Sequence, residues 1–313
     1  MRISLVCIVV LALATFAFAQ TPSAPPFDAA FDAYWGDQKA ELAGYDLKFP
    51  RYGQIRTGSA VAIFVTEPFS NEARVKADAG RHSSADEFPV FKLNLVEDFP
   101  TGLYDYNLMT SVFVAMKAVN NRPPGTPAKI SFSSQEWCGH VYHQVLLDDG
   151  AARDELHSYF DGEADQQNKL DLPNNAATED ALPLWARGLA GPYLKPGESV
   201  QLPMLRSLKI ARLVHRPVVV QAATLERNEK PERVTVPAGE FEAEVRVAKT
   251  PDGTWTFWVE REHPHRLIQW THSSGIEAKL VASDRLTYWQ MHDEGMEKSL
   301  GKIGFKPRPA RTP

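Results

Sequence analysis

The sequence predicts a mainly β protein, built as an antiparallel curved sheet or half-barrel meander with a few helices; an α+β fold is the alternative. Two patterns support this fold class. Apolar and polar residues alternate along several segments, most clearly over residues 104–114, which is the period of a half-buried strand. In the second half, short strand-like runs are separated by turns rich in Gly, Pro, Asp and Ser, as in a meander.

The N-terminus predicts a secretory signal peptide over residues 1–19. A positive charge at Arg2 precedes an apolar stretch that is too short to span a bilayer, and Ala17-Phe18-Ala19 has the form of a cleavage site. A Pro-containing spacer follows over residues 20–26. We therefore expect cleavage near Ala19-Gln20, a periplasmic or extracellular mature protein, and no integral membrane segment after cleavage.

A first β-rich region, residues 27–200, is predicted to carry a helix near each end. Apolar side chains at helical spacing predict a helix from Phe27 to Gly44, and Thr178 is placed to cap another from Glu179 to Leu189. The segments between them that predict strands are Ala60–Thr66, Phe91–Leu95, Tyr104–Val114, Ile130–Phe132, Trp137–Leu147 and Asp154–Phe160.

A second region, residues 201–297, is predicted to be an antiparallel meander, and a basic Pro-containing tail follows over residues 298–313. Its predicted strands are Val218–Leu225, Phe241–Val247, Thr254–Val259, Arg266–Thr271, Ile276–Ala282 and Arg285–Gln290. The turn signals between them are Pro237-Ala238-Gly239, Pro251-Asp252-Gly253, His263-Pro264-His265 and Ser273-Ser274-Gly275.

Composition and motifs exclude several function classes. The formal net charge is −5, and no basic face or stripe is evident, so we expect no nucleic-acid partner. The sequence contains no phosphate-binding loop, dinucleotide fingerprint, nucleophile elbow or paired-cysteine zinc motif, so we expect no cofactor and no metal. Of the two cysteines, only Cys138 remains after cleavage of the leader, and it cannot form an internal disulfide.

Residues 136–143 contain the densest group of reactive side chains. Interpreted as a strand, the segment puts Glu136, Cys138 and His140 on one face and His143 on the other, which weakens a metal site made by the two histidines. Cys138 and His140 could form a nucleophile pair oriented by a third group, although side chains two apart on a strand are separated by about 7 Å. Glu136, Cys138 and His140 are therefore the catalytic candidates, with a packed strand and a buried thiol as the alternative.

Two further groups are candidates for ligand binding. Arg51 and Tyr52 precede a predicted strand and form either an anion clamp or an ordinary charged loop. Aromatic residues on both faces of the predicted meander indicate either an apolar cavity or core packing. The candidate ligand-binding residues are Trp255, Phe257, Trp270, Trp289, Arg51 and Tyr52. Three histidines around one predicted hairpin form either a metal cluster or exposed turns: His263, His265 and His272.

The C-terminal third resembles a family of exported bacterial proteins of unknown function. The resemblance rests on Val236-Pro237-Ala238-Gly239-Glu240-Phe241, on Trp255 to Val259, and on Gly275 to Ser283. Those proteins share a Val-Pro-Ala-Gly-x-Phe turn followed by a β-meander. The resemblance implies a sheet similar to the curved half-barrels of LolA-like lipoprotein carriers.

The N-terminal part resembles a second group of exported proteins, some of which carry the label "septum formation inhibitor Maf". The matching segments are Tyr34-Trp35, Lys39-Ala40-Glu41, Arg51-Tyr52-Gly53, Phe64 to Phe69, Met109-Thr110-Ser111 and Gln135 to His140. Maf proteins proper are cytoplasmic nucleotide pyrophosphatases with a Ser-x-Ser-Pro-Arg-Arg signature, which this chain lacks. The resemblance therefore implies export and supplies no catalytic residues.

These observations predict a non-enzymatic binder of an apolar or envelope ligand, with a lipid or another envelope component as partner. Two alternatives stay open. One is a Cys/His-based hydrolase or metal-dependent enzyme that uses Cys138 and His140. The other is an envelope assembly or interaction protein, because residues 20–200 carry 15 basic and 25 acidic side chains whereas residues 201–313 carry 18 and 14. The sequence carries no signal for the oligomeric state.

Overall fold

The protein is a mainly β molecule in which sixteen strands form one open, mostly antiparallel sheet. The structure is a computed structural model that describes residues 27–307. The predicted signal peptide, its cleavage site, the spacer and the last residues of the tail lie outside the described residues.

The first eight strands form a continuous meander, in which each strand pairs antiparallel with the next. They are β1 (Ala40–Arg51), β2 (Gln54–Ser70), β3 (Glu87–Pro100), β4 (Asp105–Ala115), β5 (Pro127–Glu136), β6 (Gly139–Asp148), β7 (Ala151–Ser158) and β8 (Gln166–Asp171). Strands β2 to β7 follow the predicted strand rhythm of the first region and are mostly longer than the sequence pattern indicates, whereas β1 and β8 were not predicted as strands.

The remaining strands extend the same sheet from the other side of β1, which pairs antiparallel with β16. They are β9 (Ala177–Thr178), β10 (Ser199–Leu205), β11 (Val220–Arg227), β12 (Glu232–Val236), β13 (Gly239–Thr250), β14 (Gly253–Glu260), β15 (Leu267–His272) and β16 (Glu277–Leu286). The pairing of β9 with β10 is parallel. The regions 27–200 and 201–297 thus contribute strands to one sheet.

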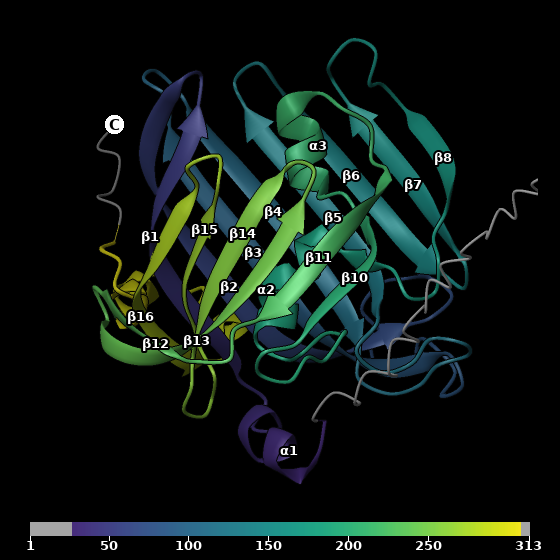
Figure 1. The fold of residues 1–313 in the computed structure, drawn as a ribbon, viewed down its shortest axis with the longest axis horizontal. Helices are drawn as coiled ribbons and strands as arrows, with labels where there is room; N and C mark the ends of the chain where they lie inside the picture. Colours follow the sequence, from purple (N-terminus) through teal and green to yellow (C-terminus); the bar gives the residue numbers. More distant parts are fainter. Residues whose placement is uncertain (1–26, 308–313) are drawn as a thin grey trace, which may run out of the picture.

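Short helices fill the inside of the curled sheet and cover parts of its outside. They are α1 (Ala29–Trp35), η1 (Glu179–Ala181), α2 (Leu182–Ala186), α3 (Leu208–Val214), η2 (Tyr288–Gln290) and η3 (Met296–Ile303). In Figure 1, α2 and α3 lie between the layer of β10, β11 and β13–β15 and the layer of β2–β8. Lys209 of α3 contacts both layers, because its ammonium group binds Glu97 of β3 and lies 5.8 Å from the ring centroid of Trp255 in β14.

One large hydrophobic core occupies the inside of the curl. Alternate residues of β1 to β7, of β10 and β11, and of β14 to β16 contribute to it, together with Leu184 and Trp185 of α2. Burying such apolar surface is the main favourable contribution to folding. Polar groups are also buried inside the molecule, among them Lys209 of α3 with Glu97 of β3, and Arg187 after α2 with Glu41 of β1.

The predicted helix from Phe27 to Gly44 is wrong in its second half, because β1 begins at Ala40. Helix α1 ends at Trp35, and Tyr45, Leu47 and Phe49 then alternate into the core. Gly44 does not stop a helix. A Cβ atom there would lie 2.1 Å from the carbonyl oxygen of Ile303, so glycine is required where η3 packs against the strand. Tertiary pairing with β2 and β16 overrides the local helical spacing.

Three other predictions need correction. The strand predicted from Trp137 to Leu147 begins at Gly139, because Trp137 and Cys138 form the turn between β5 and β6. Residues 276–282 and 285–286 belong to one strand, β16, and the rest of the second predicted strand is η2. Thr178 precedes the predicted helix, but its side chain makes no capping hydrogen bond. The sequence pattern missed β10 and α3.

No helix within the described residues is long and apolar enough to cross a membrane.

Candidate functional site

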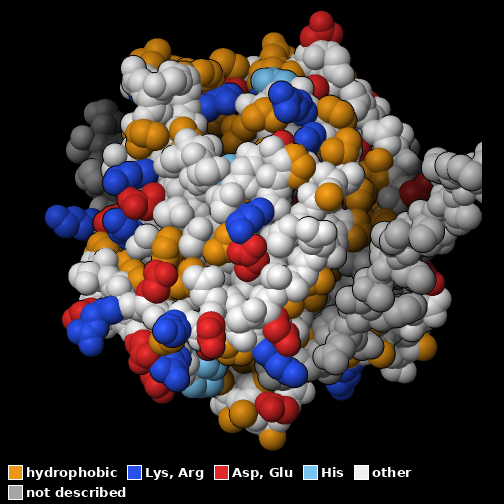
Figure 2. Space-filling model, viewed as in Figure 1, with side chains coloured by type: hydrophobic (Ala, Val, Ile, Leu, Met, Phe, Trp, Pro, Cys, Tyr) orange, Lys and Arg blue, Asp and Glu red, His pale blue; other side chains and the backbone are white. Residues whose placement is uncertain are grey.

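The site that gathers most of the predicted residues lies at one end of the sheet, which we call the rim. In an antiparallel meander alternate turns lie at the same end, so the β1–β2, β3–β4, β5–β6 and β7–β8 turns meet here. The rim is the upper end in Figure 1, beside α3. Six of the eleven exposed large hydrophobic side chains of the described residues lie at or next to it: Tyr52, Ile55, Leu103, Trp137, Tyr159 and Val214. Figure 2 shows hydrophobic side chains along this upper edge, with basic and histidine side chains among them.

Arg51 is the central cation of the rim. It ends β1, and its Nη1 donates to the carbonyl oxygen of Leu213, 3.1 Å away, while its Nη2 donates to the hydroxyl of Tyr106 at 3.0 Å. Its guanidinium lies 4.6 Å from the ring centroid of Tyr52 and 5.0 Å from that of Tyr106. These contacts hold the planar group in a fixed orientation between two aromatic rings, which favours directional recognition by arginine.

A chain of tyrosine hydroxyls extends from Arg51 toward solvent. The hydroxyls of Tyr52 and Tyr106 are 2.6 Å apart, and those of Tyr52 and Tyr104 are 3.3 Å apart. Burial and the hydrogen bond with Tyr52 raise the pKa of Tyr106 to about 12, so its hydroxyl stays protonated at neutral pH. Hydroxyls both donate and accept, so this chain offers several hydrogen-bonding directions at the surface.

The turn between β5 and β6 brings an exposed indole to the same place. The Trp137 side chain is 73% exposed, and its ring stacks on that of Tyr104 at a centroid distance of 6.1 Å and an interplanar angle of 22°. Buried Glu136 shapes the turn, because its carboxylate accepts a 2.7 Å hydrogen bond from the backbone N–H of Cys138. A large apolar ring face is therefore presented to solvent by a short, internally bonded turn.

A second buried cation, Arg212, lies beneath the rim on α3. Its guanidinium lies 3.9 Å from the ring centroid of Phe160, and its Nη1 is 3.3 Å from Nε2 of His215. Burial lowers the pKa of Arg212 below its usual value. Nδ1 of His215 is 2.6 Å from the Glu163 carboxylate, so this imidazole links α3 to the β7–β8 connection.

We define the rim cluster as Arg51, Tyr52, Tyr104, Tyr106, Trp137 and Arg212. Within the described residues, neither arginine of the cluster has a carboxylate within 4.0 Å, and the Nε atoms of both are buried without a hydrogen-bond partner. Glu136 and Glu163 act on Arg212 at longer range. The cluster therefore combines hydrogen-bond donors, hydroxyls and ring faces.

The structure separates the predicted pair of Cys138 and His140. Cys138 is an exposed turn residue rather than a buried strand residue, and the closest partner of its Sγ is the Tyr104 hydroxyl at 4.0 Å. His140 is exposed on β6 and makes no side-chain hydrogen bond with Cys138. A nucleophile pair requires such a contact. Glu136 is used within the turn. The arrangement shows no base for the thiol among the described residues.

The predicted aromatic strip lies inside the curl. Trp255, Phe257 and Trp270 are buried, and the first two stack at a centroid distance of 6.1 Å. They line a cavity of only about 30 Å³ together with polar groups of η1 and α3. That volume holds about one water molecule, whereas an acyl chain needs several times more. Trp289 lies apart from them in η2 and makes an edge-to-face contact with the ring of Tyr288.

The three histidines of the second region do not form a metal site. His263 and His265 are exposed at the β14–β15 turn, with ring centroids 6.1 Å apart, whereas His272 is buried at the end of β15 beside Trp255. Residues 27–307 contain no group of three or more His, Cys, Asp or Glu side chains that could hold a metal ion.

Sequence reasoning found Arg51 and Tyr52 but missed most of the rim cluster. The sequence pattern places Tyr104 and Tyr106 in a predicted strand but does not indicate a binding role for them. Arg212 lies in a helix that the pattern did not predict. The available signal was topological. Turns of a meander that are separated by two strands lie at the same end, so residues near 52, 104 and 137 are predicted neighbours once the strand count is known.

No protein-family model, curated protein or solved structure matches this chain. The two family resemblances therefore stay predictions, and the site has to be understood from its own geometry.

Proposed function

We propose that this protein is a non-enzymatic binding protein that acts in the periplasm or outside the cell and recognises a glycan of the envelope through the rim cluster. The signal-peptide pattern of residues 1–19 supports the location. The observation that carries the proposal is the exposed Trp137 ring stacked on Tyr104, whose hydroxyl is the outer end of the tyrosine chain that leads to Arg51.

A sugar ring matches both parts of this surface. One face of a pyranose is lined by C–H groups that pack on an aromatic ring, and its edge carries hydroxyls that exchange hydrogen bonds with arginine and tyrosine. Trp137 and Tyr104 provide the ring surface, while Tyr52 and Arg51 provide the polar edge. The buried Trp255 strip offers no comparable space, so the expected apolar ligand is replaced in this proposal by a polar one.

A co-sedimentation assay tests the proposal. We expect the mature protein to bind purified insoluble peptidoglycan, and Trp137→Ala to weaken binding by about 30-fold, because an exposed aromatic anchor contributes roughly 2 kcal/mol. The Trp137 side chain is exposed, so the substitution leaves the fold intact. Trp289→Ala is the matched control, since this exposed tryptophan lies outside the rim cluster.

Two results would contradict the proposal. One is binding to peptidoglycan that Trp137→Ala leaves unchanged. The other is that the folded parent protein binds neither peptidoglycan nor soluble envelope polysaccharide. Circular dichroism of the parent protein and of Trp289→Ala checks that both are folded in the assay. If Trp137→Ala weakens binding to a purified protein partner and to no glycan, then the ligand of the rim cluster is a protein.

A further inference from the structure

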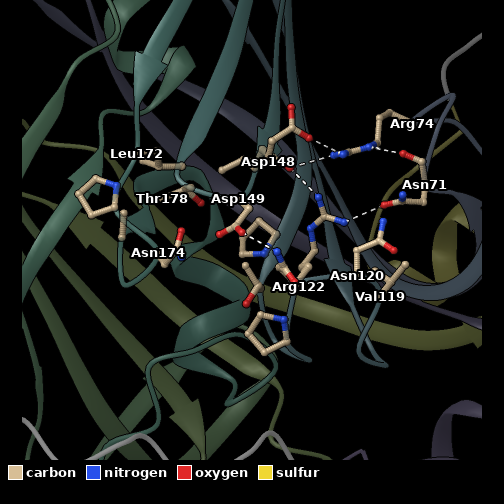
Figure 3. A pocket seen from close by; sticks show the side chains of 17 residues that line it. Asn71, Arg74, Val119, Asn120, Arg122, Asp148, Asp149, Leu172, Asn174 and Thr178 are labelled. Carbon is tan, nitrogen blue, oxygen red and sulfur yellow. Dashed lines mark hydrogen bonds and ion pairs between the residues drawn. The ribbon is translucent and has the colours of Figure 1, made fainter.

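A second site lies at the end of the sheet opposite the rim. There, the loops after β2, β4 and β6 and the segment before η1 enclose a pocket of about 350 Å³, within the size range of small-molecule sites. Figure 3 shows Arg122, Asp148 and Asp149 in the middle of this pocket, with Asn71 and Arg74 on one side and Leu172, Asn174 and Thr178 on the other.

Arg74 is part of the pocket wall rather than a free ligand-binding group. It is buried, and its guanidinium donates to the carbonyl oxygens of Asn71, Ala128 and Leu147 and to the carboxylate of Asp148. Four acceptors, one in the loop after β2 and three at the ends of strands β5 and β6, therefore engage this side chain. Its role is to hold the loops of the pocket together.

Arg122 differs from Arg74 because it has no carboxylate partner. It donates to the side-chain oxygen of Asn71 at 3.1 Å and to the carbonyl oxygen of Leu147 at 2.6 Å. Within the described residues, no carboxylate oxygen lies within 4.0 Å of it. Burial, and next the positive charge of Arg74, lower the pKa of Arg122 to about 10, with only Asp148 acting in the opposite direction.

The carboxylates of the pocket already have other partners. Asp148 forms ion pairs with Arg74 at 2.5 Å and with Arg153 at 3.2 Å. Asp149 accepts a 2.7 Å hydrogen bond from the side-chain amide of Asn121. The guanidinium of Arg122 therefore keeps donor groups available, and an added anion would supply a direct ion pair that no carboxylate of the pocket makes with it.

The opposite wall adds a polar group without a partner. Oγ1 of Thr178 is buried and has no hydrogen-bond partner, although the residue lines the pocket and is only 2% exposed. Near it, the side-chain oxygen of Asn174 accepts from the backbone N–H of Gly150 at 2.8 Å, which leaves the amide NH₂ group of Asn174 as a donor. Buried polar groups in native proteins are nearly always hydrogen-bonded, so an unpartnered one at a pocket wall points to a bound polar group.

We infer that this pocket binds a small oxyanion, the carboxylate or phosphate group of a compact ligand, with Arg122 as the main contact and Asn174 as a second donor. The site is separate from the rim cluster, since it is built from the loops at the other end of the strands. Binding here therefore goes beyond glycan recognition and is tested independently of it.

Isothermal titration calorimetry of the mature protein with inorganic phosphate and with succinate tests the inference and distinguishes the two anions. We expect saturable one-site binding of at least one of them. Arg122→Met should weaken it by at least about 10-fold, because a charge-assisted hydrogen bond is lost. Arg233→Met is the matched control, since this exposed arginine lies on β12 and lines no part of the pocket.

A second variant keeps the test decisive if Arg122→Met does not fold. Asn174→Asp retains the oxygen that accepts from Gly150 but adds a negative charge that faces the pocket, so it should weaken anion binding by a similar factor. Asn228→Asp makes the same change of charge at an exposed turn elsewhere and should have no effect. Absence of saturable binding of either anion, or binding that both Arg122→Met and Asn174→Asp leave unchanged, would overturn the inference.

Discussion

Single residues inside the curl show how strongly burial controls ionisation in this protein. His272 is 4% exposed, its ring centroid lies 4.4 Å from that of Trp255, and its Nδ1 is 2.8 Å from the Ser274 hydroxyl. Burial, and next the charge of Lys209, lower the pKa of His272 to about 4, against the opposing charge of Asp252. The folded protein therefore holds this imidazole neutral in conditions where an unfolded chain would protonate it.

This difference predicts a pH dependence of stability. The ordinary pKa of histidine is about 6.5, so between pH 6.5 and 4 the unfolded chain binds a proton at His272 that the folded chain does not. The contribution of His272 to the free energy of unfolding should therefore fall as the pH decreases through that window. Urea unfolding at several pH values should show a shallower decrease for His272→Gln than for the parent protein.

The exposed His292 provides the control, because a residue in contact with solvent has no comparable burial. His292→Gln should keep the pH dependence of the parent protein. If His272→Gln retains that dependence as well, then His272 titrates normally in the folded state.

At the scale of secondary-structure elements, α3 is fixed inside the curl by polar contacts rather than by apolar packing alone. Its N-cap residue Ser207 accepts from the N–H of Ile210 and donates to Asp180 at 2.5 Å. Lys209, in the first turn of the helix, binds the fully buried Glu97 of β3 at 2.6 Å. Helix α3 then carries Arg212 to the rim, so these buried contacts position the rim cluster.

The Lys209–Glu97 ion pair should be costly to break from one side. Lys209→Met is expected to lower the free energy of unfolding by about 3–5 kcal/mol, because the Glu97 carboxylate would remain buried without a countercharge. The double variant Lys209→Met with Glu97→Leu should recover most of this loss, since it removes both charges. Chemical denaturation of the two single variants and the double variant measures the coupling, and additive losses would show that the pair does not interact energetically.

At the scale of the whole molecule, a single sheet and a single main core join the two halves of the chain. Strand β1 pairs with both β2 and β16, and core residues come from strands before and after residue 200. The charge difference between the two regions therefore lies within one sheet. The loops at its two ends carry the rim cluster and the oxyanion pocket, which places two chemically different sites on one rigid support.

This architecture predicts that the protein unfolds in one cooperative step. Tryptophan fluorescence, which reports on both halves of the core, and far-ultraviolet circular dichroism should give coincident urea transitions, because neither half buries its core face alone. Two separated transitions would instead show that residues 27–200 and 201–297 fold as independent units.

Alternation and turn residues act locally, and they were enough to predict the fold class and most strands of the second half of the sheet. The turns at Pro251-Asp252, His263-Pro264 and Ser273-Ser274 connect strands as predicted, whereas the turn at Pro237-Ala238 follows β12, which the pattern missed. The sequence also names Arg51 and Tyr52 as candidate binding residues, which stays a prediction. The confirmed strands and turns share a cause, since each depends on neighbours within a few positions along the chain.

The tertiary structure decided what depends on distant partners. It made residues 40–44 a strand because β2 and β16 flank them, and it exposed Cys138 because the chain turns there. It filled the curl with α2 and α3, which left no lipid-sized space beside Trp255. It also brought Arg51, Tyr104, Trp137 and Arg212 together at the rim. Proximity of this kind follows from strand order and curvature, which no local pattern of residues encodes.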